Sequence, residues 1–337
     1  MPTPTRTLTA LALGSALLLT GCAADDSAAT AQQAADGAEP LEVVVGFYPY
    51  QFVAERVGGD DVVVRNLTAP GAEPHDLELS PQQVATLSAA DLVLYSEGFQ
   101  PAVDEAVAQQ AADRALDVLS TVEVRSYDED GALAEADAED DHGHGHGDGD
   151  GDEGDGDDHG DEGHDHSGED PHVWLDPTRL ATVAEAVADR MAEVDPERAD
   201  GFRERAAELT VDLEQLDAEL EAGLSSCART EMVTSHDAFG YLADRYGLEQ
   251  VAISGLSPED EPSPRRLAEV ARFAEEREVT TIFFEELVSP RVAESLAREV
   301  GAEAQVLSPL EGPPEQGDYL DAMRTNLETL RTALDCA

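Results

Sequence analysis

Residues 196–224 have the sequence PERADGFRERAAELTVDLEQLDAELEAGL, a long helical pattern in the second half of the chain. Its large apolar side chains recur with the period of an α-helix, at Phe202, Leu209, Leu213, Leu216 and Leu220. A helix of about 28 residues spans about 40 Å, which is enough to bridge two domains. We therefore expect one long helix to join two parts of the protein.

Strand and helix patterns alternate on both sides of this stretch. Before it, strand patterns occur at 41–47, 61–67, 91–95 and 115–119. After it, strand patterns occur at 231–234, 250–253, 280–284 and 305–307, with helical patterns at 238–246, 264–277, 290–300 and 318–334. Such alternation is typical of mainly parallel sheets flanked by helices. The predicted fold is α/β, with an N-terminal lobe at 41–195, a rigid linking helix at 196–224 and a C-terminal lobe at 225–337.

The N-terminus indicates export. Arg6 is the only charge before an apolar run at 8–19, which is typical of a secretory signal peptide and too short to span a membrane. The sequence LTGC that ends at Cys22 resembles a bacterial lipobox, whose cysteine is lipidated. We predict a signal peptide at 1–21, a lipid on Cys22 and a flexible tether at 22–40; an uncleaved anchor with an incidental cysteine is the alternative. The protein would then be anchored on the outer face of the cytoplasmic membrane.

A long acidic segment interrupts the first lobe at 128–168. Residues 128–170 contain twenty Asp and Glu, six His and no Arg or Lys. Few apolar side chains and strong self-repulsion predict a disordered insertion, whereas imidazoles and carboxylates are ligands for divalent transition metals. The insertion is either a solvated segment without a role or a weak metal collector or sensor, acting through His142, His144, His146, His159, His164 and His166. The net charge of −54 argues against nucleic-acid binding.

Three further histidines lie outside this segment, and each follows a predicted strand or adjoins a turn. Ligands of open α/β sheets bind beyond the carboxyl ends of the strands. His75 and His172 from the first lobe should therefore meet His236 from the second lobe in the cleft between them. Asp76 and Asp237 follow two of these histidines directly, so we expect at least one carboxylate to orient an imidazole. The pattern predicts joint ligation of a metal ion, with incidental polar roles as the alternative.

Five long motifs surround these histidines or follow them. They are PGAEPHDLELSP at 70–81, DPHVWLDP at 170–177, TSHDAFGYLADRYGL at 234–248, GLSPEDEPSPRRL at 255–267 and IFFEELVSPRVAESLARE at 282–299. Together with the lipobox they resemble the solute-binding lipoproteins of zinc and manganese ABC transporters, the ZnuA-like family, over residues 41–337. The resemblance implies two α/β lobes joined by a rigid helix, a metal bound between them, and delivery of that metal to a membrane permease and its ATPase.

The resemblance also implies a set of metal ligands. The family's three imidazole positions correspond to His75, His172 and His236. Manganese-type relatives have Glu in place of His236 and an Asp at the position of Ser289, so an acidic ligand is absent there. The fourth position stays open between water, Glu73 and Glu285. Because three imidazoles with few oxygens suit zinc and manganese prefers carboxylate-rich sites, we expect Zn²⁺, with Mn²⁺ as the alternative.

Two more cysteines, Cys227 and Cys336, lie in the part of the chain that is predicted to be exported. A remaining pair of cysteines in an exported protein predicts a disulfide. Two reduced, buried thiols are the alternative. The bond would tie the start of the second lobe to the end of the chain.

The expected function is capture of Zn²⁺ with high affinity by a monomeric receptor for an ABC importer. A secreted zinc hydrolase is one rival, because three histidines and a water are common in catalytic zinc sites. The chain has no HExxH motif and no neighbouring acid–base pair with motif spacing, so we expect no enzymatic activity. A surface lipoprotein that sequesters metal or adheres to a partner is the second rival, and it would need only the acidic segment.

Overall fold

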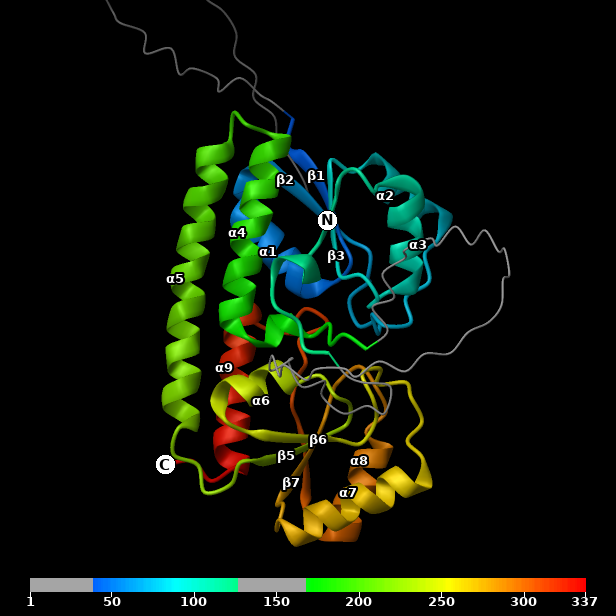
Figure 1. Ribbon diagram of the computed structural model, residues 1–337, viewed down its shortest axis with the longest axis vertical. Coiled ribbons are helices and arrows are strands. Elements are labelled where there is room, and N and C mark those ends of the chain that lie inside the picture. Colours follow the sequence, from blue (N-terminus) through cyan, green and yellow to red (C-terminus); the bar gives the residue numbers. More distant parts are fainter. Residues whose placement is uncertain (1–38, 127–167) are drawn as a thin grey trace, which may run out of the picture. The chain divides into compact units, whose positions relative to one another are not determined.

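The structure is a computed structural model that describes residues 39–126 and 168–337 (Figure 1). These residues belong to one compact unit, Glu39–Ala337. The predicted signal peptide, Cys22 and nearly all of the predicted tether lie outside the described residues, as does the acidic insertion up to residue 167. None of the described helices is both long enough and apolar enough to cross a bilayer.

A four-stranded parallel sheet forms the centre of the N-terminal lobe. Its strands are β1 (Leu41–Val45), β2 (Val62–Asn66), β3 (Leu92–Tyr95) and β4 (Ala115–Asp117), in the order β2-β1-β3-β4. The helices of this lobe are α1 (Tyr48–Gly58), α2 (Pro81–Ala89), α3 (Pro101–Gln110) and α4 (Pro177–Val194). Helices α1 and α4 cover one face of the sheet and α2 and α3 the other (Figure 1). Val43, Val44 and Val45 of the central strand are therefore all buried.

The C-terminal lobe repeats this plan. Its parallel strands are β5 (Glu231–Thr234), β6 (Glu249–Ala252), β7 (Thr281–Phe284) and β8 (Glu303–Val306), in the order β6-β5-β7-β8. Its helices are α6 (Gly240–Tyr246), α7 (Pro264–Glu276), α8 (Arg291–Val300) and α9 (Tyr319–Ala333). Helices α7 and α8 bury one face of the sheet, while α6 and α9 contribute to the core on the other. The α/β fold with two parallel sheets, predicted from the alternating pattern, is confirmed.

Several helices begin and end where the sequence provides a capping residue. Ser80 Oγ accepts a hydrogen bond from the Gln83 backbone N (3.3 Å), and Gln83 Oε1 accepts one from the Ser80 backbone N (2.9 Å). This reciprocal pair starts α2 just before Pro81. Gly247 and Gly301 end α6 and α8 with φ of +68° and +76°, a conformation that costs glycine little.

Helix α5 (Ala199–Leu224) joins the lobes, and its five predicted apolar side chains are fully buried. It packs against α1 and α4 of the first lobe and against α6 and α9 of the second (Figure 1). The helix begins at Ala199 rather than Pro196 because Asp195 Oδ1 accepts hydrogen bonds from the backbone N atoms of Glu197 and Arg198, which holds these residues in a turn. One hydrophobic core therefore extends along α5 from one sheet to the other.

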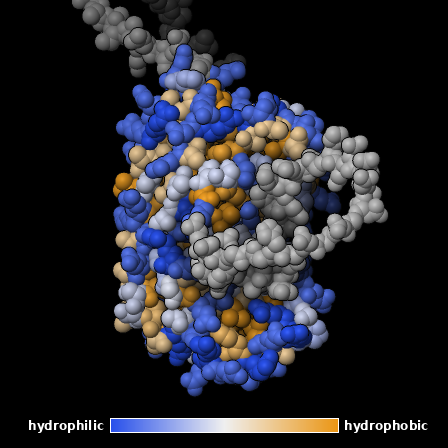
Figure 2. Space-filling view, viewed as in Figure 1, coloured by the Kyte–Doolittle hydropathy of each residue, from blue (hydrophilic) through white to orange (hydrophobic). Residues whose placement is uncertain are grey.

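The described surface is mostly polar. Figure 2 shows hydrophilic residues over much of one face, with hydrophobic residues in small patches between them. Large apolar side chains that are exposed among the described residues include Val211, Val292 and Val306. Scattered valines of this kind do not by themselves indicate a binding surface.

Cys227 and Cys336 form a disulfide that joins the residues after α5 to the residues after α9. Changing both cysteines to serine should lower the free energy of unfolding by about 2–5 kcal/mol, because a cross-link between distant residues restricts the unfolded chain. Chemical denaturation of the wild type and the double variant, each with and without reductant, measures this. Reduction should destabilise only the wild type; a wild-type curve that does not shift on reduction would contradict the prediction.

Candidate metal centre

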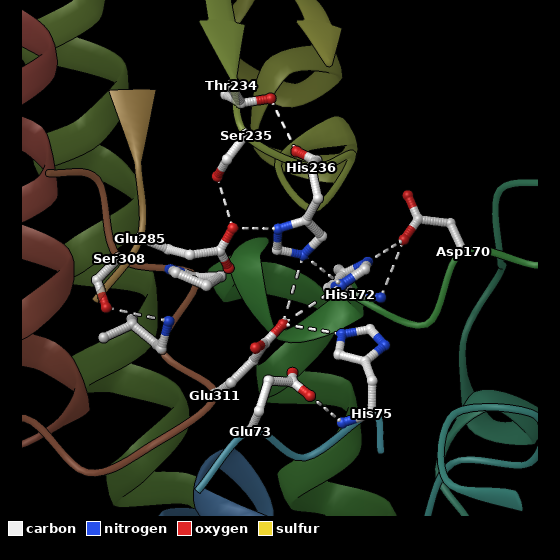
Figure 3. Close-up of polar contacts among 12 residues, drawn as sticks. Glu73, His75, Asp170, His172, Thr234, Ser235, His236, Glu285, Ser308 and Glu311 are labelled. Atoms are coloured by element: carbon white, nitrogen blue, oxygen red, sulfur yellow. Dashed lines mark hydrogen bonds and ion pairs between the residues drawn. The ribbon is translucent and has the colours of Figure 1, made fainter. Parts of the chain in front are cut away.

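The structure brings His75, His172 and His236 together between the two sheets (Figure 3). His236 comes directly after β5 and His75 lies in the loop after β2, so both extend from the carboxyl ends of their sheets. His172 immediately precedes a 3₁₀ turn (Val173–Leu175) that leads into α4. The ring centroids are between 5.3 and 5.8 Å apart. The predicted convergence of the three histidines is therefore present in the fold.

A fourth group, Glu311, completes the cluster and was missed in the sequence. Its Oε1 lies 3.2 Å from His75 Nε2 and 3.6 Å from Nε2 of both His172 and His236. One ligand atom from each of the four residues lies within 4.8 Å of the other three. Glu311 follows β8, so it obeys the same strand-end rule as the histidines. The only sequence signal for it is a carboxylate beyond the last strand, in the proline-rich loop SPLEGPP at 308–314.

The loop that carries Glu311 is held from both lobes. Trp174, fully buried beside His172, donates a hydrogen bond from Nε1 to the Pro309 carbonyl (2.7 Å). The Asn326 side chain forms two hydrogen bonds with Ser308. It accepts one from the Ser308 backbone N (3.0 Å) and donates one to the Ser308 carbonyl (2.7 Å). Leu310 is buried with φ of +60°, a left-handed conformation that is unfavourable for this residue type. The surrounding contacts hold this strained backbone in place and so fix the carboxylate that follows it.

Carboxylates orient two of the imidazoles. Nδ1 of His172 lies 2.8 Å from Asp170 Oδ1, and Nδ1 of His236 lies 2.7 Å from Glu285 Oε1. Because a carboxylate oxygen only accepts hydrogen bonds, each outer nitrogen donates to its carboxylate, and each Nε2 faces the cluster, where it can bind a metal ion once it carries no proton. The sequence suggested Asp76 and Asp237 for this role, but the structure assigns it to Asp170 and Glu285. Asp170 is separated from His172 by one residue in the sequence, and Glu285 is far from His236.

Glu73 and Glu285, two of the options for the fourth position, have other partners. Glu285 contacts the outer nitrogen of His236 and also accepts a hydrogen bond from the Ser235 hydroxyl (2.5 Å). Glu73 Oε2 accepts a hydrogen bond from the His75 backbone N (2.9 Å), which shapes the loop around this histidine. Burial and the negative charge of Glu311 raise the pKa of Glu73 to about 8. Glu311 Oε1 lies near the Nε2 atoms of all three histidines, which makes Glu311 a further candidate for the fourth position that the sequence left open.

The four groups are almost fully withdrawn from water, and their charges depend on one another. Burial alone would raise the pKa of Glu311, but its hydrogen bonds with the three imidazoles outweigh burial and hold that pKa well below the usual range. Burial would lower the pKa of His236, yet the carboxylates of Glu285 and Glu311 outweigh it and raise this pKa to about 10. For His75, burial outweighs the single contact with Glu311, so its pKa is lowered.

The donor set fits a divalent transition metal. Among the described residues, the buried side-chain oxygens without a hydrogen-bond partner include Glu73 Oε1, Glu285 Oε2 and Glu311 Oε2. A buried, unpartnered carboxylate oxygen is costly unless a cation or a donor compensates it. Three imidazole nitrogens and one carboxylate oxygen are the ligand types and the number that zinc takes in closed tetrahedral sites, whereas catalytic zinc keeps one position open for water. This arrangement therefore suits holding a metal ion better than hydrolysis.

The six histidines that the sequence singled out as accessory ligands lie outside the described residues. They are His142, His144, His146, His159, His164 and His166. Within the described ranges, the group of His75, His172, His236 and Glu311 is the candidate metal centre.

Comparisons with known proteins find zinc-binding relatives of this chain. The zinc-binding lipoprotein AdcA of Streptococcus pneumoniae (strain R6) is 36% identical over 327 residues, which cover 95% of this chain but 61% of AdcA. This chain thus spans less than two thirds of the AdcA proteins that it matches. The high-affinity zinc uptake system protein ZnuA of Bacillus subtilis (strain 168) is 32% identical over 332 residues, which cover 94% of each protein.

A solved structure has the same fold. The Zn(II)-bound form of a variant of AdcAII from Streptococcus pneumoniae matches with a TM-score of 0.71 and 26% sequence identity, covering 88% of this chain and 98% of that one. The model of the ZnuA family, described as the periplasmic component A of the zinc-uptake complex, matches residues 43–333. This chain therefore belongs to the ZnuA family of zinc-uptake components.

Proposed function

We propose that this protein captures Zn²⁺ outside the cytoplasm and delivers it to the permease and ATPase of an ABC importer. The observation that carries the proposal is the buried cluster of three imidazoles and one carboxylate, whose ligand atoms lie within 4.8 Å of one another. His75, His172, His236 and Glu311 would bind the ion, which is cargo rather than a resident cofactor. Family membership over residues 43–333 and the zinc-related names of the relatives also support a role in zinc uptake.

Zinc is favoured over manganese by the chemistry of the donor atoms. Zn²⁺ accepts four nitrogen and oxygen ligands in a tetrahedron, whereas Mn²⁺ prefers oxygen-rich, octahedral sites. The cluster supplies three nitrogens and one carboxylate, and Ser289 stands where manganese-type relatives would provide an acidic residue. A manganese receptor with this set of donors would be short of oxygen ligands.

The proposed location rests on the N-terminal sequence. The signal peptide at 1–21 would direct export, and a lipid on Cys22 would hold the protein at the outer face of the cytoplasmic membrane, with residues 22–40 as a tether. A receptor on a short tether samples a small volume near its permease, which raises the local concentration of loaded receptor. The protein would act there as a monomer.

The insertion at 128–168 would act as a weak collector or sensor of zinc. Six histidines among many carboxylates provide replaceable ligands at high local density, close in sequence to His172. Weak sites of this kind would increase the metal concentration near the buried cluster without competing with it for the bound ion. A lipoprotein that only sequesters metal would rely on this segment alone and would not need the buried cluster.

Isothermal calorimetry of the purified protein should detect one tight Zn²⁺ equivalent and much weaker Mn²⁺ binding. Changing His75, His172, His236 or Glu311 separately to Ala should abolish the tight equivalent, because each change removes one of four ligands and leaves a polar cavity. Asp76→Asn, next to His75 but exposed, is the matched control and should retain tight binding. Tight zinc binding that survives all four ligand substitutions would refute the proposed site.

The carboxylate of Glu285, which contacts the outer nitrogen of His236, should affect the zinc affinity although it is not a proposed ligand. Glu285→Gln should weaken tight zinc binding by about 10- to 100-fold, the usual cost of losing a partner that orients a metal ligand. Glu286→Gln changes the adjacent, exposed residue and should leave the affinity unaltered. Competition with a zinc chelator measures both dissociation constants. Equal affinities for the two variants would show that the contact between Glu285 and His236 does not orient the ligand.

Deleting residues 128–167 separates the receptor from a sequestering protein. The shortened chain should retain the tight zinc equivalent and lose the weak ones, because the four proposed ligands lie outside the deletion. Calorimetry at low and high zinc-to-protein ratios counts the two classes. Loss of nearly all zinc binding would favour a sequestering lipoprotein, and a wild type without weak equivalents would refute the collector role.

A further inference from the structure

Tyr241 lies where the two lobes meet beside the metal centre. It is in α6, shortly after His236, and it is buried. Its hydroxyl donates a hydrogen bond to the Asp170 carbonyl (2.7 Å) and accepts one from the Arg125 backbone N (2.8 Å). Arg125 and Asp170 belong to the N-terminal lobe, on the two segments that enter and leave the acidic insertion. A single phenol therefore connects the C-terminal lobe to both of these segments.

These two segments form a short antiparallel ladder. Ser126 and Glu169 make an antiparallel bridge, and the Asp170 backbone N donates to the Arg125 carbonyl (2.8 Å). In a regular antiparallel pair, two facing residues exchange both of their N–H···O bonds. Here the Tyr241 hydroxyl replaces the return bond: it accepts a hydrogen bond from the Arg125 backbone N and donates one to the Asp170 carbonyl. The hydroxyl is thus inserted into the ladder.

The side chain of Asp170 extends from this ladder to the metal centre. Its Oδ1 lies 2.8 Å from His172 Nδ1 and 3.0 Å from the His172 backbone N. Without the hydroxyl of Tyr241, the two backbone groups would either stay unpaired in a buried place or approach each other directly. A direct approach would move Asp170, and with it the imidazole of His172.

The ring of Tyr241 is itself fixed by cations and by a glycine. The guanidinium carbon of Arg179 lies 4.9 Å from the ring centroid and that of Arg125 lies 5.7 Å away. Arg125 also forms an ion pair with Asp244 of α6 (2.9 Å). A Cβ atom at Gly240 would clash with the Arg125 guanidinium, so glycine permits this close approach. The hydroxyl is therefore held at one position relative to both lobes.

We propose that Tyr241 is a positioning residue for the metal: by completing the Arg125–Asp170 ladder, it sets the distance between His172 of one lobe and His236 of the other. The Nε2 atoms of these histidines are 3.4 Å apart, and Tyr241 links the turn before His172 to the helix after His236. The proposal rests on the proposed zinc function. Tyr241 provides no ligand atom, but it would help to hold the geometry of the site.

The test compares Tyr241→Phe with Tyr246→Phe. Tyr246 is in the same helix, and its hydroxyl donates to Asp217 of α5 (2.9 Å), so its loss removes one phenol hydrogen bond without touching the ladder. Chelator competition should show that zinc binds about 10- to 100-fold more weakly to Tyr241→Phe, as for other partners that orient metal ligands. The absorption spectrum of bound Co²⁺, which reports coordination geometry, should change in Tyr241→Phe. Tyr246→Phe should match the wild type in both measurements.

The outcomes separate the possible explanations. Unchanged zinc affinity and Co²⁺ spectrum in Tyr241→Phe would overturn the proposal, and so would equal losses in both variants, since these would indicate a general effect of removing a buried hydroxyl. A wild type that does not bind zinc tightly would instead refute the proposed function. In this comparison, the positioning role fails when the wild type binds zinc and the two phenylalanine variants behave alike.

A second measurement needs no variant and applies if Tyr241→Phe does not fold. Coupling between two sites is reciprocal, so a ladder that stabilises bound zinc must itself be stabilised by zinc. Hydrogen exchange at the Arg125 amide, which donates to Tyr241, should become slower when zinc binds. The Ala228 amide, near the disulfide, donates to the Leu334 carbonyl and serves as the reference. Exchange at Arg125 that changes no more than at Ala228 would overturn the proposal.

Discussion

The carboxylate of Glu311, enclosed by three imidazoles, is the interaction on which the rest of the site depends. Burying an anion costs free energy unless it is compensated, and here hydrogen bonds with the three imidazoles compensate the carboxylate. The same oxygen would bind the zinc ion that replaces those contacts. Charge, burial and ligand number therefore favour one small divalent cation, and the elements around the cluster hold the four side chains in place for it.

The fold provides this rigidity by joining the two lobes at many points. The core along α5 extends from one sheet to the other, and Trp174 fixes the Glu311 loop from the opposite lobe. Tyr319 of α9 donates to the Trp174 carbonyl (2.5 Å), which adds a bond across the same boundary. Tyr241 connects α6 to the turn before His172. The four side chains of the candidate site come from separate segments, but the contacts between those segments fix their separations.

Much of this arrangement follows from the sequence, because parallel strands place their carboxyl ends at one edge. His75 and His236 were predicted from that rule, and the apolar period of residues 196–224 predicted the linking helix, which begins at Ala199 in the structure. Glu311 escaped prediction because acidic residues are common in this chain and its loop has no periodic pattern. The orienting roles of Asp170 and Glu285 escaped prediction because their contacts with imidazoles depend on tertiary packing, whereas adjacency in the sequence suggested Asp76 and Asp237.

X-ray absorption spectroscopy at the zinc edge, with one equivalent of Zn²⁺ bound, tests the central claim most directly. It measures the number and type of atoms bound to the ion. The account predicts three imidazole nitrogens and one carboxylate oxygen at about 2.0–2.1 Å. Two or fewer imidazoles, or a shell composed mainly of oxygens, would contradict a site made of His75, His172, His236 and Glu311.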